Sequence, residues 1–216
     1  MKNNLIKMMA LSSALSIILL ICRIQWTGYL YFIFLPWNLF LAWIPFCCAL
    51  AIRELKAGAS RWLIACLFCC WLVFFPNSPY ILTDLFHLRP KQDVPLWFDL
   101  VLILSFAWNG LFLGYTSLFM IHRFLEKLFS KRTVWLFISG IMLLCGFGIY
   151  LGRYPRWNSW DVITSPIALM RDISGMMLHP LDHPRMLGVT FFFSLFLMMS
   201  YVTLITFIQN LQHERK

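Results

Sequence analysis

Six long apolar stretches run through this chain, and they constrain its fold more than any other feature. A helix needs about 20 apolar residues, within a range of about 17–25, to cross the hydrocarbon core of a membrane. The stretches lie at about 6–22, 26–52, 62–83, 97–121, 134–152 and 187–208. The sequence therefore predicts an all-α membrane protein in which residues 1–216 form a single multi-pass domain with six transmembrane helices.

The composition excludes a soluble globular protein. Hydrophobic residues make up 61% of the chain and charged residues only 12%, against about 25% charged residues in an ordinary soluble domain. A soluble chain of 216 residues could not hide 21 Phe and ten Trp behind a polar shell. We expect membrane lipids to be the main partner, and no nucleic-acid partner in spite of the formal net charge of +9.

The distribution of charge predicts the orientation in the membrane. With six spans, the two tails and the turns at 53–61 and 122–133 lie on one side and carry eleven Lys and Arg, against seven on the other side. The side with more cations is normally cytoplasmic. We therefore expect both termini in the cytoplasm and the loop at 153–186 outside, with net charges of +8 inside and +1 outside.

The first apolar stretch is the shortest. Fifteen uncharged residues lie between Lys7 and Arg23, so we expect these two long side chains to reach the headgroups at either end. Lys2 and Lys7 ahead of an apolar run are also typical of a signal peptide, but no small-residue cleavage pattern follows. We expect the segment to be retained as a membrane anchor.

The third stretch is interrupted by Pro76-Asn77-Ser78-Pro79. Each proline removes a backbone donor and disturbs the preceding turn. Lipid offers no partners to freed backbone groups, so a break at membrane depth must be satisfied by protein or by water in a cavity, as in the binding sites of transporters. The alternative is that the helix ends at Phe75 and the next residues lie in the outer headgroup region.

The outer loop contains a helix signal of its own. Ser165-Pro166 is a typical helix start, and apolar residues then recur on one side of a helix. We predict a short amphipathic helix of about 13 residues on the outer membrane surface, between the fifth and sixth spans. Its apolar side consists of Ile167, Leu169, Met170, Ile173, Met176 and Met177.

Small and polar residues also occur inside the spans. Gly110/Gly114 and Gly148/Gly152 form two GxxxG pairs, which allow helices to approach closely. Asn38 and Asn109 are amides at mid-span, and we interpret them as partners in hydrogen bonds between helices.

Ionisable side chains gather where the third, fourth and fifth spans leave the membrane on the outer side. Asp84 and His87 are three residues apart, so a helix would place them on one face. Such groups at a membrane edge are costly and therefore functional candidates. The carboxylates and the imidazole would supply acid–base groups or metal ligands, and the two arginines would clamp phosphate or carboxylate. The predicted catalytic residues are Asp84, His87, Asp99 and Asp161, and the predicted ligand-binding residues are Asn77, Arg153, Arg156 and Asn158.

A simpler interpretation exists for part of this set. Tyr154, Trp157 and Trp160 are typical of an interfacial aromatic belt, and the neighbouring arginines would then bind lipid headgroups. The seven cysteines all fall in predicted spans, where we expect them to pack helices. Phosphate-binding glycine loops and the HExxH and GxSxG motifs are absent. We predict no metal site, and the sequence leaves the cofactor unknown.

Four motifs resemble a family of uncharacterised bacterial membrane proteins, the domain of unknown function 1361. They are WNLFLAWIP at 37–45, WLVFFPNSPYILTDLFHL at 71–88, WFD at 97–99 and GRYPRWNSWD at 152–161. The resemblance covers most of residues 35–162. It implies a multi-pass protein of the bacterial plasma membrane and assigns no activity.

The working hypothesis is an outward-facing polar site that binds or processes an anionic ligand, such as a lipid phosphate or a lipid-linked intermediate. Whether the protein is an enzyme stays open at this stage. One alternative is a small-solute carrier or channel whose pathway uses Asn38, the Pro76–Pro79 break and Asn109. Another is a structural or assembly subunit whose outer motif docks another protein.

Overall fold

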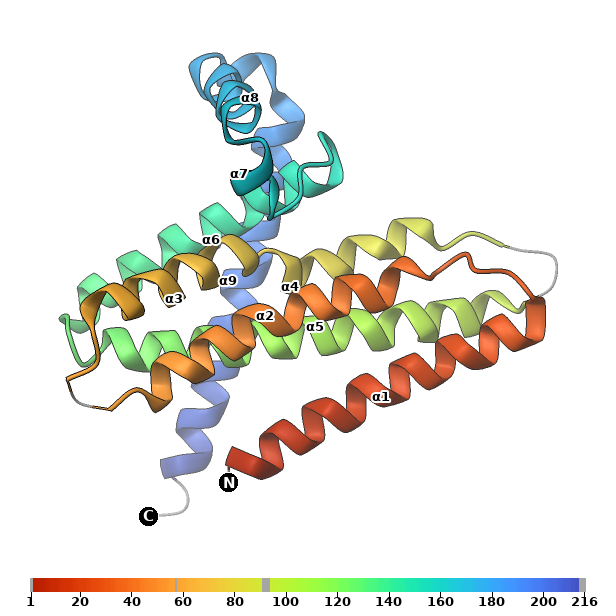
Figure 1. The fold of residues 1–216 in the computed structure, drawn as a ribbon, viewed down its shortest axis with the longest axis horizontal. Helices are drawn as coiled ribbons and strands as arrows, with labels where there is room; N and C mark the ends of the chain where they lie inside the picture. Colours follow the sequence, from red (N-terminus) through yellow and green to blue (C-terminus); the bar gives the residue numbers. More distant parts are fainter. Residues whose placement is uncertain (1, 57, 91–93, 214–216) are drawn as a thin grey trace. The chain divides into compact units, whose positions relative to one another are not determined.

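The computed structural model describes residues 2–56, 58–90 and 94–213, and these residues form helices and connecting loops without a strand (Figure 1). Six helices are long and apolar enough to cross a membrane, which confirms the all-α fold class. The chain divides into two compact units, Met1–Phe124 and Leu125–Lys216, and each is described by itself. The charged residues outside the described ranges are Lys91, Asp93, Glu214, Arg215 and Lys216.

The first unit contains four of the six candidate spans. Three are single helices, and the third span is a succession of helical segments between Arg61 and His87. The segments are α1 (Lys2–Thr27), α2 (Phe34–Glu54), α3 (Arg61–Phe74), α4 (Asn77–Tyr80), the 3-10 helix η1 (Ile81–His87) and α5 (Leu96–Leu125).

The first two helices differ from the predicted ranges. The first continues beyond the expected end at 22, through Arg23 to Thr27, and the second begins at Phe34 instead of at 26. Gly28 ends α1 with a left-handed φ of 71°, a conformation that glycine adopts without steric cost. The loop that follows is rich in aromatic residues, so hydropathy alone did not separate it from a span. The expected position of Arg23 at the headgroups is also wrong, because its side chain is buried.

The Pro76–Pro79 break does not end the third span. The amide N–H groups of Ser78 and Tyr80 donate to the carbonyl oxygens of Phe75 and Pro76, at 3.1 and 3.0 Å. The hydroxyl of Ser78, which is buried, donates to the carbonyl oxygen of Ala42 in α2 at 3.4 Å. The helix α3 itself ends at Phe74, next to the end expected at Phe75, and the short segments α4 and η1 continue the candidate span to His87. The depth of the break in the membrane stays a prediction.

The first glycine pair brings α5 against this break, as predicted. A Cβ atom on Gly110 would lie 2.5 Å from the carbonyl oxygen of Ser78 and 2.8 Å from the Cδ1 atom of Ile81. A Cβ atom on Gly114 would lie 2.9 Å from the Cβ atom of Ser78. Both glycines thus allow a close approach that a larger residue would prevent.

This contact gives a direct test of the packing. Gly110→Ala is expected to lower the free energy of unfolding by about 1–3 kcal/mol, the usual cost of overpacking a well-packed core, because the Ser78 backbone must move. Gly140→Ala is the matched control, since nothing lies within 4 Å of a Cβ atom at Gly140. Unfolding by denaturing detergent measures both. Equal stabilities of the two variants would contradict the close approach.

Hydrogen bonds attach α1 to its neighbours in the first unit. The Asn109 amide in α5 donates to the Ser12 carbonyl oxygen at 3.2 Å, the Ser16 hydroxyl at 2.9 Å and the Ser105 carbonyl oxygen at 2.8 Å. The Trp43 indole in α2 donates to the Ser13 hydroxyl at 3.3 Å. The interpretation of Asn109 as a partner in hydrogen bonds between helices is confirmed.

The second unit contains the other two candidate spans. Its long helices pack closely, because the Ser194 hydroxyl donates to the Met142 carbonyl oxygen at 2.9 Å, and a Cβ atom on Gly146 would lie 2.5 Å from the Thr190 carbonyl oxygen. The elements are α6 (Lys131–Arg153), α7 (Asp161–Thr164), α8 (Pro166–Leu178), the 3-10 helix η2 (Pro180–Asp182) and α9 (Pro184–His213).

The predicted outer helix is confirmed as α8, which has 13 residues and begins with Pro166. Ser165 makes no side-chain capping bond, so the proline rather than the serine side chain marks this start. The apolar side is divided: Leu169 and Met176 are buried, and Met176 packs with Tyr150 and Met186, whereas Ile167, Met170 and Met177 are exposed. Contact of the exposed residues with the membrane surface stays a prediction.

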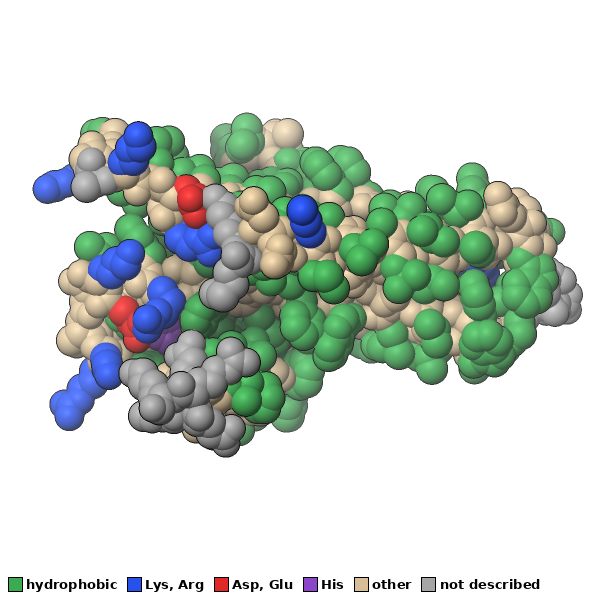
Figure 2. Space-filling model, turned by 90° about the horizontal axis from the view of Figure 1, so that it is seen from below, with side chains coloured by type: hydrophobic (Ala, Val, Ile, Leu, Met, Phe, Trp, Pro, Cys, Tyr) green, Lys and Arg blue, Asp and Glu red, His purple; other side chains and the backbone are tan. Residues whose placement is uncertain are grey.

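Apolar side chains cover the outside of the helices. Large residues such as Trp62, Leu136 and Phe192 are among the most exposed. Figure 2 shows this cover as green side chains. Such a surface is typical of helices that have lipid rather than water as their solvent.

Candidate functional site

Asp84 lies in η1, the last helical segment of the third span, and its side chain is only 2% exposed. Its Oδ2 atom accepts a hydrogen bond of 2.8 Å from the Asn38 amide in the first turns of α2. Burying a carboxylate is costly unless it is hydrogen-bonded. The contact therefore ties η1 to α2 and fixes the direction of the Asp84 carboxylate.

His87 lies one 3-10 turn after Asp84. A 3-10 helix has three residues per turn, so side chains three apart are eclipsed. The Nδ1 atom of His87 lies 3.9 Å from Oδ1 of Asp84, and the imidazole is 44% exposed. Its ring packs on Phe34, with 5.0 Å between the ring centroids. The predicted shared face of Asp84 and His87 is confirmed, although a 3-10 turn and not an α-turn provides it.

This pair has the arrangement of an acid–base dyad. A buried carboxylate beside one imidazole nitrogen selects the tautomer and leaves the other nitrogen available for proton transfer. The 3.9 Å separation is longer than a hydrogen bond, and such contacts commonly tighten when a ligand binds. The Asp84 carboxylate would orient the ring, and the exposed His87 imidazole would give or take the proton.

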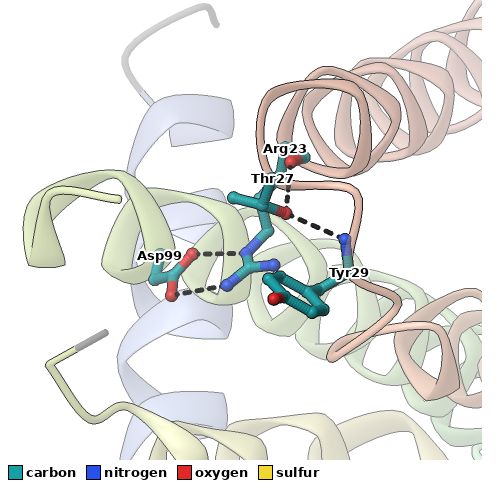
Figure 3. A network of polar contacts seen from close by, with 4 residues as sticks. All are labelled: Arg23, Thr27, Tyr29 and Asp99. Atoms are coloured by element: carbon teal, nitrogen blue, oxygen red, sulfur yellow. Dashed lines mark hydrogen bonds and ion pairs between the residues drawn. The ribbon is translucent and has the colours of Figure 1, made fainter. Parts of the chain in front are cut away.

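Asp99, the third predicted catalytic residue in this unit, binds Arg23 (Figure 3). The Nε and Nη2 atoms of Arg23 donate to the two carboxylate oxygens at 2.7 and 3.2 Å. The side chains are 1% and 2% exposed. This two-point geometry is the strongest form of an Arg–carboxylate contact, and it joins α1 to the start of α5.

Aromatic rings cover the guanidinium and connect the two polar pairs. The Cζ atom of Arg23 lies 4.7 Å from the Phe32 ring centroid and 5.5 Å from that of Tyr31. Phe32 and Phe34 are 6.2 Å apart, and Phe34 contacts His87. The Arg23–Asp99 and Asp84–His87 pairs therefore share one aromatic wall, formed by Phe32 in the turn before α2 and Phe34 at the start of α2.

Arg23 was not among the predicted site residues. Its position at the end of a run of fifteen uncharged residues suggested a headgroup contact instead. The sequence did contain a signal for this pair. Arg23 and Asp99 lie at the ends of two predicted spans on the same side of the membrane, and such residues are candidates for an ion pair. Only tertiary contact decides which acidic residue an arginine meets, and Asp84 was an equal candidate from sequence.

Asn77, predicted to bind ligand, lies in the break before η1. Its amide donates to the carbonyl oxygen of Phe74 at 2.9 Å. In a regular α-helix the Phe74 carbonyl oxygen would accept from the Ser78 N–H, which here donates to Phe75 instead, so the Asn77 amide supplies a replacement donor. The observed contact of Asn77 is thus local to the break.

In the second unit, the motif at 152–161 forms a tight turn after α6. Arg153 is the last residue of α6 and is partly buried, whereas Arg156 is exposed. Arg156 has a φ of 64°, the left-handed conformation that is costly for a residue with a side chain. The turn is closed by a 3.0 Å hydrogen bond from the Trp157 amide to the Leu151 carbonyl oxygen.

Asp161 and Asn158 bind each other. The backbone N–H of Asn158 donates to Asp161 Oδ2 at 2.7 Å and its amide donates at 3.2 Å, while the Thr164 hydroxyl donates to Oδ1 at 3.0 Å. These bonds favour the carboxylate, first through the backbone N–H of Asn158, and lower the pKa of Asp161 from its usual value. A lowered pKa makes Asp161 a weaker base than a group that titrates near neutral pH.

The predicted site residues thus fall into two groups. Asn77, Asp84, His87 and Asp99 belong to the first unit, and within it the structure brings Asp84 and His87 together but pairs Asp99 with a different partner. Arg153, Arg156, Asn158 and Asp161 belong to the second unit. Their combination into one site stays a prediction.

The cysteines are free thiols distributed over four helices. Cys48 and Cys145 are buried, as expected for packing, whereas Cys22, Cys47, Cys66 and Cys69 are exposed on the apolar surface. Within the described part of the chain, no group of three His, Cys, Asp or Glu side chains is arranged to hold a metal ion.

Comparison with known proteins identifies the family but gives no activity. No curated protein and no solved structure matches the chain. One family profile matches residues 37–200, a range that includes Asn38, Asp84, His87 and Asp99, while Arg23 precedes it. The chain therefore belongs to the family described as "Protein of unknown function (DUF1361)".

Proposed function

We propose that this protein binds an anionic ligand in its first unit, where η1 meets the first turns of α2, and processes it by acid–base chemistry at Asp84 and His87. The observation that carries the proposal is a buried carboxylate beside an exposed imidazole, with Asn38 holding the carboxylate. A carboxylate and an imidazole in contact are the residue types that transfer protons near neutral pH. In these roles His87 is the catalytic acid–base residue and Asp84 its positioning residue.

The proposed ligand carries a phosphate group, as in a membrane lipid or a lipid-linked intermediate. Arg153 and Arg156 provide two guanidinium groups within one short turn, and guanidinium matches the oxygens of phosphate. An apolar protein surface gives lipid-borne ligands direct access from the bilayer. We propose that Arg153 and Arg156 recognise a phosphate group at the turn after α6.

The proposed location is the bacterial plasma membrane, with both termini in the cytoplasm and the Asp84–His87 pair outside. The excess of Lys and Arg at the opposite ends of the spans supports this orientation. A carrier or channel is less well supported, because the amides of Asn38 and Asn109 already donate to neighbouring groups. These hydrogen bonds hold helices together and give no sign of a polar pathway.

Gene replacement tests the function. Asp84→Asn and Arg153→Ala are expected to leave expression and membrane insertion unchanged and to produce the phenotype of the gene deletion. The physical reason is that the first change removes the charge that orients His87 and the second removes an anion-binding group. Asp182→Asn and Arg171→Ala are matched controls in exposed positions and are expected to behave as wild type. Site variants that also behave as wild type would contradict the proposed function.

A further inference from the structure

One terminal nitrogen of Arg23 has no hydrogen-bond acceptor among the described residues. The Nε and Nη2 atoms donate to Asp99, but Nη1 is buried and unpartnered. A buried donor of this kind costs about 1–3 kcal/mol, and more when it belongs to a charged group. A guanidinium has donors on two usable edges, so Nη1 remains available on the edge that Asp99 does not occupy.

Two aromatic rings lie over the guanidinium. The Tyr31 ring lies over the guanidinium with 5.5 Å between Cζ and the ring centroid, and Tyr31 is 55% exposed. Of the two rings over the guanidinium, that of Phe32 is buried, so Tyr31 is the exposed one. Tyr31 belongs to the loop after Gly28, which is tied to α1 by the bond of 3.2 Å from the Tyr29 amide to the Thr27 hydroxyl (Figure 3).

The unpartnered donor is also close to the proposed catalytic pair. Phe32 lies against Arg23 and Phe34 lies against His87, and the two rings contact each other. A ligand at this aromatic wall could reach both the guanidinium and the imidazole. An aromatic wall with a cation at one end and an acid–base group at the other suits a molecule with an apolar body and an anionic group.

We propose that Arg23 is a phosphate-binding residue, with Nη1 donating to a phosphate oxygen of the ligand after the Tyr31 ring moves aside. This inference rests on the proposed function in one respect, since the phosphate belongs to the ligand that His87 acts on. Asp99 then has a defined role as the group that holds the guanidinium in place. The phosphate is then the second anionic partner of the Arg23 guanidinium, bound through Nη1.

The test measures the thermal unfolding midpoint of the purified full chain in neutral detergent. The probes are inorganic phosphate, phosphatidylglycerol, and diacylglycerol with the same acyl chains. A ligand that binds only the folded state raises the midpoint in a concentration-dependent way. We expect phosphatidylglycerol but not diacylglycerol to stabilise wild type. A response to inorganic phosphate as well would identify the free anion as sufficient, whereas no response to either phosphate probe would overturn the inference.

Two variants separate phosphate binding from the structural ion pair. The exchange of charges in Arg23→Asp with Asp99→Arg keeps an ion pair between α1 and α5 but moves the guanidinium, so the phosphate response is expected to be lost. Arg23→Lys keeps the charge beside Asp99 without Nη1, and its apparent affinity is expected to fall about tenfold or more. If the exchange variant does not fold, Arg23→Lys decides. A wild-type response in either folded variant would contradict the inference.

His87→Gln keeps this test distinct from that of the proposed function. This variant retains Arg23 and Asp99 and is expected to respond to phosphatidylglycerol as wild type does. A response that depends on Arg23 supports the inference even if His87 proves unnecessary for processing. Processing by His87 together with no dependence on Arg23 would retain the function and overturn the inference.

Discussion

Asp99→Ala is expected to lower the free energy of unfolding by about 3–5 kcal/mol, the usual cost of removing one partner from a buried ion pair. The reason is that Arg23 would keep its charge at a position where its side chain is only 1% exposed. Desolvation of an unpaired guanidinium is far more costly than the loss of one ordinary hydrogen bond. Unfolding by denaturing detergent, followed by tryptophan fluorescence, measures the change.

The double variant Arg23→Met with Asp99→Leu is the control for this prediction. It removes both charges and replaces them with apolar side chains of similar length, a change that is often neutral or stabilising for a buried pair. We expect it to be more stable than Asp99→Ala alone. If the single and double variants were equally destabilised, helix packing rather than the unpaired charge would be the cause, and the pair would not have the role assigned here.

His87→Gln is expected to slow ligand processing by about 10²–10⁴-fold, the usual contribution of a general acid–base group. Glutamine keeps hydrogen-bonding capacity and approximate size but cannot transfer a proton near neutral pH. Because the imidazole is 44% exposed, the substitution should change stability little. His179→Gln is the matched control, since His179 is an exposed histidine that follows α8.

The sequence predicted those features of the helices that depend on neighbouring residues. The α8 helix begins at Pro166 as predicted, because a proline at a first helical turn and a repeating apolar side are both readable from neighbouring residues. The close approach at Gly110 and Gly114 followed from their spacing alone. The three-residue spacing of Asp84 and His87 also predicted their shared face, although the 3-10 geometry was not foreseen.

The features that the sequence did not predict depend on contacts between distant segments of the chain. The end of α1 was placed too early because the charge of Arg23 was taken to end the apolar span, whereas the helix continues to Thr27. The pairing of Arg23 with Asp99 joins residues 76 positions apart, and sequence spacing gives no rule for such a choice. The hydrogen bond from Asn38 to Asp84 is likewise tertiary, and it changes Asn38 from a mid-span amide into a support of the candidate site.

Native mass spectrometry of wild type and His87→Gln, purified in mild detergent, tests the central claim most directly. An acid–base variant that still binds its ligand cannot process it, so the variant should retain a phosphate-containing molecule that wild type releases or holds in converted form. His179→Gln should give the wild-type spectrum. Spectra of wild type and His87→Gln that show the same retained molecules, or none, would contradict acid–base processing at the Asp84–His87 pair.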